Sequence, residues 1–337
     1  MNNFILYIGN KLASKGRTAT TIDTLSKLLT QEGITVYTAS SCSNKLLRFL
    51  DMLIATIRYS SKVSVVFIDT YSTQNFYYAV AVSKVCRLLR LPYVPILHGG
   101  NLPSRLETHS KLSEKLFRNA KVNISPSHYL LEIFKAKGFQ NVQYIPNSIP
   151  LDDYPFFLRK ELQPRLLWVR SFAELYNPML AVEVVKKLHE KGIRATLTMV
   201  GPDKDGSLEK CALEAEKYNL PIKFTGKIER LEWISLSKAH DIFINTTNFD
   251  NTPVSLIEAS ALGLPIISTN VGGIPYLIED YKTGVLVPPN NAEVFVNAIT
   301  DLLSNSELAK NLIQNGREKA TNFNWQVVKQ DWLSLIN

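Results

Sequence analysis

The sequence predicts two doubly wound α/β domains, and three observations support this fold class. The chain has 337 residues, which is more than one compact core usually holds and suits two domains of about 150 residues each. Short apolar runs alternate with helical patterns almost from end to end, and parallel strands need such crossover connections. The alternation pauses at residues 146–164, where four prolines and little periodicity indicate a linker.

The first half predicts an N-terminal domain over residues 1–150. Residues 4–8 are β-branched, aliphatic and aromatic and end at Gly9, as is typical of a strand. The amphipathic pattern over residues 20–32 predicts a helix that ends at Gly33. Further strands are expected at 34–37, 63–68, 93–97, 122–124 and 142–145, with helical patterns between most of them.

The second half predicts another such domain over residues 160–322. A helix over 178–191 begins at a proline and stops at Gly192. Strands are expected at 166–169, 196–200, 222–224, 242–245, 266–268 and 285–287, and the last helices at 292–303, 307–320 and 325–335. Ligands of doubly wound folds bind outside the carboxyl ends of the strands, so we expect a site in loops lining a cleft between the domains.

The composition excludes several classes of protein. Hydrophobic residues make up 45% and charged residues 20%, which is typical of a globular chain and not of a disordered or fibrous one. Cys42, Cys86 and Cys211 form no CxxC pair, so a reducing compartment fits better than a disulfide framework. No apolar run reaches the ~20 residues of a membrane span. A signal peptide has basic residues before its apolar region, and no basic residue precedes the first apolar run here. We therefore expect a soluble, cytoplasmic protein.

The positive charge is concentrated in the first half. Residues 1–150 carry 18 Lys and Arg against 7 Asp and Glu, whereas residues 151–337 carry 20 against 23. This asymmetry suggests that the first half faces an anionic partner, such as a membrane surface or a phosphorylated substrate. Nucleic acid is not expected as a partner, because the chain has no binding motif and a modest net charge of +8.

One basic, apolar segment leaves two interpretations open. Residues 44–62 combine leucines and isoleucines with lysines and arginines in a helical pattern. We expect a core helix with a basic solvated face. The alternative is a helix lying on an anionic membrane surface, as in a peripheral protein on the inner face of the plasma membrane.

The most informative stretch spans residues 245–289. Asp250 and Glu258 flank a loop-to-helix junction, and Thr252-Pro253-Val254 would place backbone N–H groups at a helix N-terminus, where they can hold phosphate or hydroxyl oxygens. Glu258 could accept hydrogen bonds from two vicinal hydroxyls. Taken alone, the pattern also fits a helix with a surface carboxylate.

This stretch resembles the signature of the retaining glycosyltransferases of family 4, which have the GT-B fold of two Rossmann-like domains. The resemblance extends through nearly the whole chain. The matching segments are Asp250-x7-Glu258, Ala259-Ser260-Ala261-Leu262-Gly263-Leu264-Pro265, Val271-Gly272-Gly273, Thr283-Gly284-Val285, Ile145-Pro146-Asn147-Ser148, Val200-Gly201-Pro202 and Asn324-Trp325. It implies that a last helix, over 325–337, packs back on the N-terminal domain.

The resemblance also implies roles for individual residues. Glu258 would hold the donor ribose hydroxyls, and Arg170 would pair with the donor diphosphate, where a guanidinium stabilises the charge that the leaving group gains. His98 would face the donor sugar, and Gly16 would lie in the glycine loop beneath the diphosphate. Asp250 and the backbone around Asn251, Thr252, Pro253 and Val254 would hold the donor sugar and phosphates.

The chain departs from the family pattern at three positions. Tyr176 stands where the family has a second phosphate-binding Lys, Asp250 where it usually has Glu, and Tyr276 where a Glu often follows the Gly-Gly loop. We hypothesise that Lys15 or Arg17 supplies the missing positive charge.

The resemblance implies an enzyme that transfers a sugar from a nucleotide-sugar donor to an acceptor hydroxyl with retention. We expect the acceptor to be a glycan or lipid-linked glycan of bacterial surface polysaccharide assembly (lipopolysaccharide, capsule or exopolysaccharide). We expect neither a metal nor another cofactor, since the five histidines show no ligand spacing. The alternatives are a non-catalytic subunit that binds sugar nucleotides and, less favoured, a nucleotide-sugar epimerase.

Overall fold

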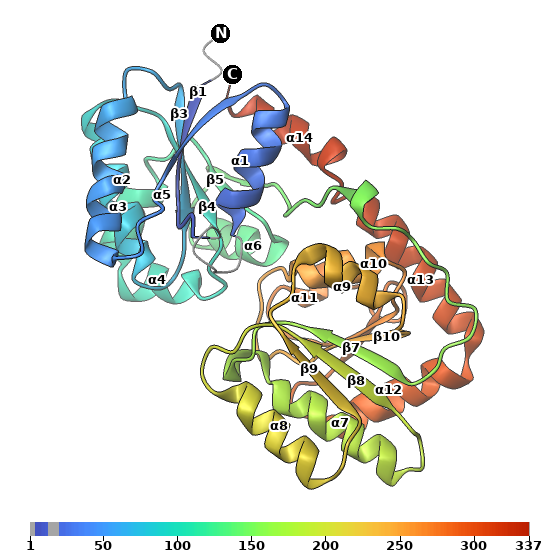
Figure 1. Ribbon diagram of the computed structural model, residues 1–337. Helices are drawn as coiled ribbons and strands as arrows, with labels where there is room; N and C mark the ends of the chain where they lie inside the picture. Colours follow the sequence, from blue (N-terminus) through green and yellow to red (C-terminus); the bar gives the residue numbers. More distant parts are fainter. Residues whose placement is uncertain (1–3, 13–19, 337) are drawn as a thin grey trace. The chain divides into compact units, whose positions relative to one another are not determined.

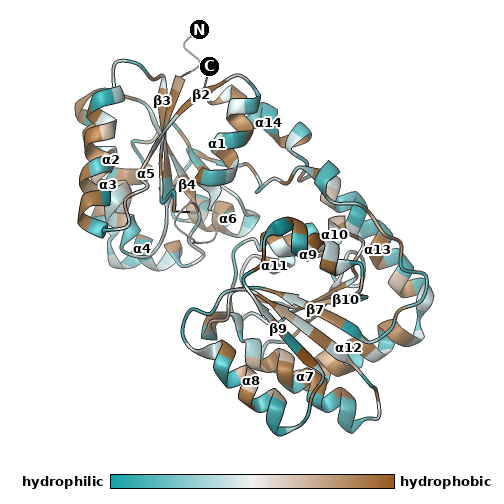
Figure 2. Cartoon of the chain, in the orientation of Figure 1, coloured by the Kyte–Doolittle hydropathy of each residue, from teal (hydrophilic) through white to brown (hydrophobic). Residues whose placement is uncertain are grey.

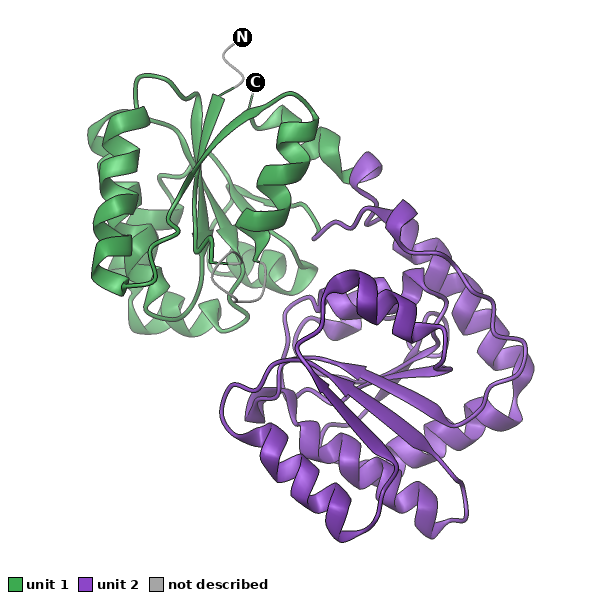
Figure 3. Cartoon of the chain, in the orientation of Figure 1, with its two compact units in different colours: residues 1–146, 328–337 green, residues 147–327 purple. Residues whose placement is uncertain are grey.

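The computed structural model describes residues 4–12 and 20–336 and has two compact units (Figure 1). Unit 1 comprises residues 1–146 and 328–337, and unit 2 comprises residues 147–327 (Figure 3). Each unit has one six-stranded sheet in which the described strand pairs are parallel. Helices cover both faces of each sheet (Figure 1). The two-domain α/β fold that the sequence predicts is therefore confirmed.

Unit 1 has the strand order β2-β1-β3-β4-β5-β6. Its strands are β1 Phe4–Ile8, β2 Thr35–Ala39, β3 Val65–Thr70, β4 Tyr93–Leu97, β5 Asn123–Ser125 and β6 Val142–Tyr144. Its helices are α1 Thr21–Gln31, α2 Lys45–Tyr59, α3 Asn75–Leu88, α4 Leu102–Thr108, α5 Ser110–Phe117 and α6 His128–Ala136. Every residue of β3 is buried, as expected of a central strand covered on both faces.

Unit 2 has the strand order β12-β11-β10-β7-β8-β9. Its strands are β7 Arg165–Val169, β8 Thr196–Val200, β9 Ile222–Gly226, β10 Ile242–Asn245, β11 Ile266–Thr269 and β12 Val285–Val287. Its α-helices are α7 Pro178–Glu190, α8 Ser207–Lys217, α9 Arg230–Ser237, α10 Val254–Ala261, α11 Ile274–Leu277, α12 Ala292–Ser304 and α13 Ser306–Thr321, and its 3-10 turns include η2 Leu151–Asp153 and η3 Glu174–Tyr176.

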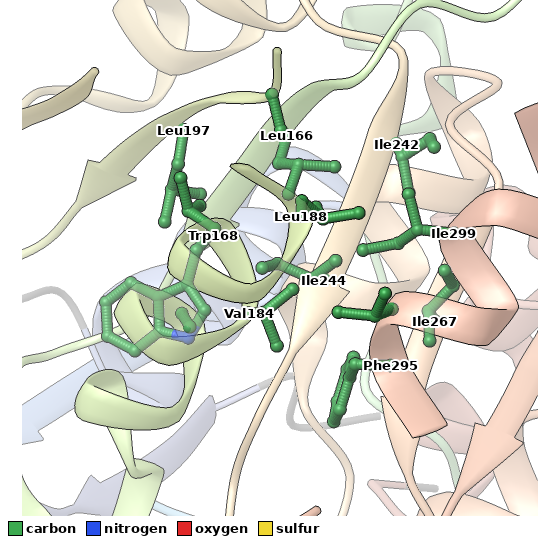
Figure 4. Packing of buried hydrophobic residues seen from close by; sticks show 14 of the residues in the cluster. Leu166, Trp168, Val184, Leu188, Leu197, Ile242, Ile244, Ile267, Phe295 and Ile299 are labelled. Carbon is green, nitrogen blue, oxygen red and sulfur yellow. The ribbon is translucent and has the colours of Figure 1, made fainter. Parts of the chain in front are cut away.

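One hydrophobic core of unit 2 lies between its sheet and helices that include α7 and α12. Ile244 of β10 and Ile267 of β11 pack with Val184 of α7 and Phe295 of α12 (Figure 4). The strands read as continuous apolar runs because both faces of a parallel sheet are covered. This core holds the strands in place, and the carboxyl ends of the strands carry the candidate site.

The last helix, α14 (Trp325–Ser334), leads from unit 2 into unit 1. The Trp332 ring lies 5.7 Å from the Phe67 ring of β3. Lys329 pairs with Glu32 at 3.2 Å, and Lys121 Nζ donates to the Leu335 carbonyl at 2.8 Å. The C-terminal residues are thus anchored to the first unit by aromatic, ionic and hydrogen-bonded contacts.

The proline-rich segment expected as a linker is packed within unit 2, and we call residues 147–164 the strap. Its residues Ile149, Leu151 and Tyr154 are buried in a second hydrophobic core of that unit. Arg159 is also buried, and its guanidinium donates five hydrogen bonds to backbone carbonyls. The acceptors belong to Phe157, Ser237, His240, Leu262 and Gly263. Prolines interrupt periodicity without preventing burial, so the pattern concealed this packing.

Helix α2 differs from the expected core helix. Its leucines and isoleucines are mostly exposed, whereas Arg48, Met52 and Ala55 are buried. Arg48 turns inward because its guanidinium donates to the carbonyls of Cys42 and Ser43. No helix within the described ranges combines the length and the apolar content that crossing a bilayer requires.

Candidate functional site

The candidate site of unit 2 lies at the carboxyl ends of β7 and β10, which are neighbours in the sheet. Arg170 directly follows β7, and its backbone N–H donates to the Val200 carbonyl at 2.9 Å. A guanidinium nitrogen, Nη2, contacts Asp250 Oδ2, and these side chains are 20% and 12% exposed. Burial lowers the pKa of Arg170, while Tyr176 and Glu258 counteract this effect.

The Tyr176 ring packs against the Arg170 guanidinium. The guanidinium carbon lies 4.5 Å from the centre of the Tyr176 ring, a cation–π arrangement. Arg170 Nε has no hydrogen-bond acceptor among the residues that the structure describes. Tyr176, which stands where the family has a second phosphate-binding Lys, therefore holds the Arg170 guanidinium in place. Arg170 keeps its Nε–H available to donate to a bound anion.

The Gly-Gly loop fixes the position of Asp250. The Gly273 N–H donates to the Asp250 carbonyl at 2.9 Å. A Cβ at Gly273 would lie 1.8 Å from the Asn251 carbonyl oxygen, and one at Gly272 would lie 2.1 Å from that of Asp250. Gly272 also has a φ of +56°, which side chains disfavour. Only glycines allow this approach, so the two glycines of the motif position its acidic residue.

The N-terminus of α10 follows the loop that carries Asp250, after β10. Pro253 is the N-cap and has no side chain that could accept hydrogen bonds from the first helical turn. The Thr252 carbonyl accepts from Asn147 Nδ2 at 3.4 Å, and Ser255 Oγ is buried without a hydrogen-bond partner among the described residues. A helix N-terminus of this kind favours anions through its N–H groups and dipole.

Glu258, in the second turn of α10, is paired with the strap. The Tyr154 hydroxyl donates to Glu258 Oε1 at 2.5 Å. Arg317 of α13 holds this arrangement, because it donates to the carbonyls of Tyr154 and Ala261 at 3.1 and 2.6 Å. Burial raises the pKa of Glu258 to about 7, although the Tyr154 hydroxyl and the charge of Arg230 act in the opposite direction.

A second cluster lies in unit 1, at the carboxyl ends of β3 and β4. His98 follows β4, and its Nε2 lies 2.7 Å from Asp69 Oδ1. The Tyr7 hydroxyl donates to the same oxygen at 2.8 Å, and the carboxylate is 1% exposed. A carboxylate accepts hydrogen bonds, so His98 carries its proton on Nε2 and turns Nδ1 toward the Thr21 hydroxyl, 3.5 Å away. Burial and Asp69 raise the pKa of Tyr7.

The structure brings together the predicted residues of the second domain. Arg170, Asp250, Glu258 and the backbone of residues 251–254 lie around the carboxyl ends of β7 and β10. His98 belongs to the unit 1 cluster, and Gly16, like Lys15 and Arg17, lies outside the described residues.

Two site residues escaped the sequence analysis. Asp69 had a signal, since it is an acidic residue near the end of an apolar strand. Tyr154 had none, because its partner lies 104 positions away. Among residues 4–12 and 20–336, no three His, Cys, Asp or Glu side chains form a group that could hold a metal ion.

Residues 153–319 match the protein family described as "Glycosyl transferases group 1". These residues, about half of the chain, belong to this family. The match is to the group as a whole and does not single out family 4 within it.

Named relatives agree with that assignment. The putative colanic acid biosynthesis glycosyltransferase WcaL of Escherichia coli K12 is 25% identical over 268 residues, which are 74% of this chain and 65% of WcaL. The chain therefore spans about 65% of the length of that relative.

Two solved structures share the fold over 98% of both chains. Anabaena HepE in complex with UDP-glucose has a TM-score of 0.76 and 15% identity. The sucrose-phosphate synthase of Thermosynechococcus elongatus has a TM-score of 0.78 and 19% identity. These similarities confirm the GT-B fold.

Proposed function

We propose that this group 1 glycosyltransferase chain transfers a sugar from a nucleotide-sugar donor to an acceptor hydroxyl with retention of configuration. The observation that carries the proposal is the largely buried Arg170, which has an unpaired Nε and lies beside Asp250. The N-terminus of α10 and the carboxyl of Glu258 follow in the same motif. A fixed cation and a helix N-terminus both favour a diphosphate that gains charge as it leaves.

In this proposal Arg170 holds the leaving diphosphate without needing to reorient. Tyr176 keeps the guanidinium in place from one side. The Arg170 side chain is therefore already ordered before the donor binds, and binding costs little further conformational entropy there. The departing phosphate takes the proton of the attacking acceptor hydroxyl, and no nucleophilic side chain is required. We propose that this charge stabilisation, rather than a metal, serves the leaving group.

Glu258 would hold the ribose of the donor. A carboxylate accepts two hydrogen bonds from vicinal hydroxyls, and the Tyr154 hydroxyl restricts the orientation of the side chain. Because burial raises the pKa of Glu258 to about 7, donor binding that requires the carboxylate should strengthen as the pH rises through that value.

His98 would contact the donor sugar from unit 1, and Asp69 would act as a positioning residue. The hydrogen bond from His98 Nε2 to Asp69 leaves Nδ1 as the nitrogen that can accept a hydrogen bond.

The substrates follow from the relatives. WcaL is named for colanic acid biosynthesis, and the HepE structure contains UDP-glucose. We infer a glycan or lipid-linked glycan acceptor in bacterial surface polysaccharide assembly, with UDP-sugars as the first donors to test. Three free cysteines support a reducing, cytoplasmic setting, with an anionic membrane surface as a further partner.

A second candidate function is a non-catalytic subunit that binds sugar nucleotides. The observation that favours it is Tyr176, which replaces a phosphate-binding Lys and thereby removes one charge from the diphosphate site. Such a contact is worth about 1.5–3 kcal/mol. Donor binding without turnover in the presence of a competent acceptor would support this alternative.

The test is thermal unfolding with UDP-, GDP-, ADP- and dTDP-sugars. A ligand at about 100 times its dissociation constant stabilises the protein by about 2.7 kcal/mol, enough to raise the melting temperature measurably. We expect one nucleotide class to raise it, and Arg170→Ala and Glu258→Ala to abolish the effect. Arg194→Ala, which changes an exposed arginine before β8, is the control. No response to any donor from the folded protein would contradict the proposed donor site.

A further inference from the structure

Helix α2 presents an apolar stripe to solvent along its length. Figure 2 shows brown, hydrophobic segments on this helix, at the outside of unit 1. Five large aliphatic side chains are between 44% and 65% exposed. They are Leu46, Leu47, Leu50, Ile54 and Ile57. With about 100° per residue, these five positions fall within about 100° of the helix circumference, so they form one continuous face.

The inner face of α2 is already occupied by other residues. Met52, Ala55 and Thr56 are buried against the unit, and Thr56 Oγ1 donates to the Met52 carbonyl. Phe49 stacks on Tyr78 of the neighbouring helix α3, with ring centres 5.6 Å apart. Burying the stripe inside unit 1 would require rotating the helix and breaking these contacts. The stripe is therefore a stable feature of the outer surface.

Basic residues surround the stripe. Between residues 45 and 90 the sequence has seven Lys and Arg but two acidic residues, Asp51 and Asp69, and Asp69 is buried. The exposed basic residues are Lys45, Arg58, Lys62, Lys84 and Arg90. Both α2 and α3 are crossover helices between parallel strands and pack together, so the basic residues at their carboxyl ends lie at the same end of the pair.

We propose that this face of α2 binds an anionic lipid membrane surface. The leucines and isoleucines would enter the boundary between headgroups and acyl chains, and the surrounding lysines and arginines would contact lipid phosphates. The helix has 15 residues, which suits lying in the plane of the surface. A second copy of the chain is a poorer occupant, because its own basic residues would repel those of the first.

The proposal extends the acceptor side of the proposed function and is independent of the donor site. A membrane-bound unit 1 would find a lipid-linked acceptor by diffusion in two dimensions. Binding to vesicles and binding to sugar nucleotides are separate measurements, so failure of either one leaves the other interpretable.

The test is flotation of the full chain with vesicles of phosphatidylcholine alone and of phosphatidylcholine mixed with phosphatidylglycerol. We expect binding to the mixed vesicles and little binding to phosphatidylcholine. In Leu46→Ser/Ile54→Ser we expect the partition coefficient between membrane and water to fall about tenfold or more. The variant lacks two largely exposed aliphatic side chains whose transfer from water into the membrane would favour binding. In Arg58→Gln/Lys62→Gln, and at high salt, binding to mixed vesicles should also weaken.

The control is Leu213→Ser/Val327→Ser, which removes two aliphatic side chains of unit 2 that are 60% and 59% exposed. This variant should bind as the unchanged protein does. Equal vesicle binding by the α2 double variant, or none by the unchanged protein, would overturn the proposal. A dimer in size-exclusion chromatography that only the α2 double variant loses would also overturn it, in favour of a second copy as the occupant.

Discussion

Glu258→Gln tests the electrostatics of the candidate site without a ligand. The pKa of Glu258 rises from 4.5 to about 7 because of burial, so the folded protein holds a proton that the unfolded chain releases at lower pH. Stability must then fall as the pH rises from about 4.5 to about 7, and the loss persists above that range. At 1.36 kcal/mol per pKa unit the full shift corresponds to about 3.4 kcal/mol, and partial exposure of the side chain reduces our expectation to about 2 kcal/mol.

Glutamine accepts the hydrogen bond from Tyr154 but cannot ionise. The free energy of unfolding of the variant, relative to that of the unchanged protein, should therefore rise by about 2 kcal/mol between about pH 5 and about pH 8. The measurement is the difference in denaturant midpoint between the two proteins across this range, in which all other titrating groups cancel.

Glu279→Gln is a control of opposite sign. Lys282 and Lys319 lower the pKa of Glu279 to about 2, so its carboxylate stabilises the fold above its unfolded pKa and loses this effect as the pH falls. This variant should be less stable than the unchanged protein at neutral pH. A Glu258→Gln difference that does not change with pH would refute the reasoning.

Three further substitutions test contacts described above. Asp69→Asn should lower kcat about tenfold or more with little change in KM for the donor, because the amide no longer enforces the His98 tautomer; an unchanged kcat would argue against positioning by Asp69. Gly273→Ala should cost about 2 kcal/mol or more, since its Cβ meets the Asn251 carbonyl, and an unchanged melting temperature would contradict that geometry. Arg159→Met should cost about 3–5 kcal/mol in denaturant unfolding by leaving buried carbonyls unpaired, whereas a cost below 1 kcal/mol would mean that water replaces the guanidinium.

The parts of the fold that depend on local pattern were predictable from the sequence. Parallel strands are short apolar runs whose positions hydrophobicity reveals, and β4 lies at the predicted residues 93–97. The motif of unit 2 was equally readable, because Asp250 and Glu258 lie within one strand–loop–helix segment and Gly273 follows the next strand, β11. Residues of this motif are close in the sequence and are therefore also close in the structure.

Contacts between distant residues were not predictable in this way. The periodicity of α2 identifies an amphipathic helix but cannot tell which face points inward, and the carbonyls that bind Arg48 decide it. Similarly, the absence of a Lys at position 176 suggested a missing charge, whereas the ring that replaces it supports Arg170. In each case the deciding partner lies outside the local pattern.

The strap has a consequence for exchanging domains between related enzymes. A chimera joined at residue 165, where β7 begins, would separate Arg159 from the carbonyls that it binds and Tyr154 from Glu258. The natural boundary for recombination is therefore near residue 147, ahead of the strap. On the other side, the exchanged piece should end near residue 327, so that the final residues stay with the domain whose strands they cover.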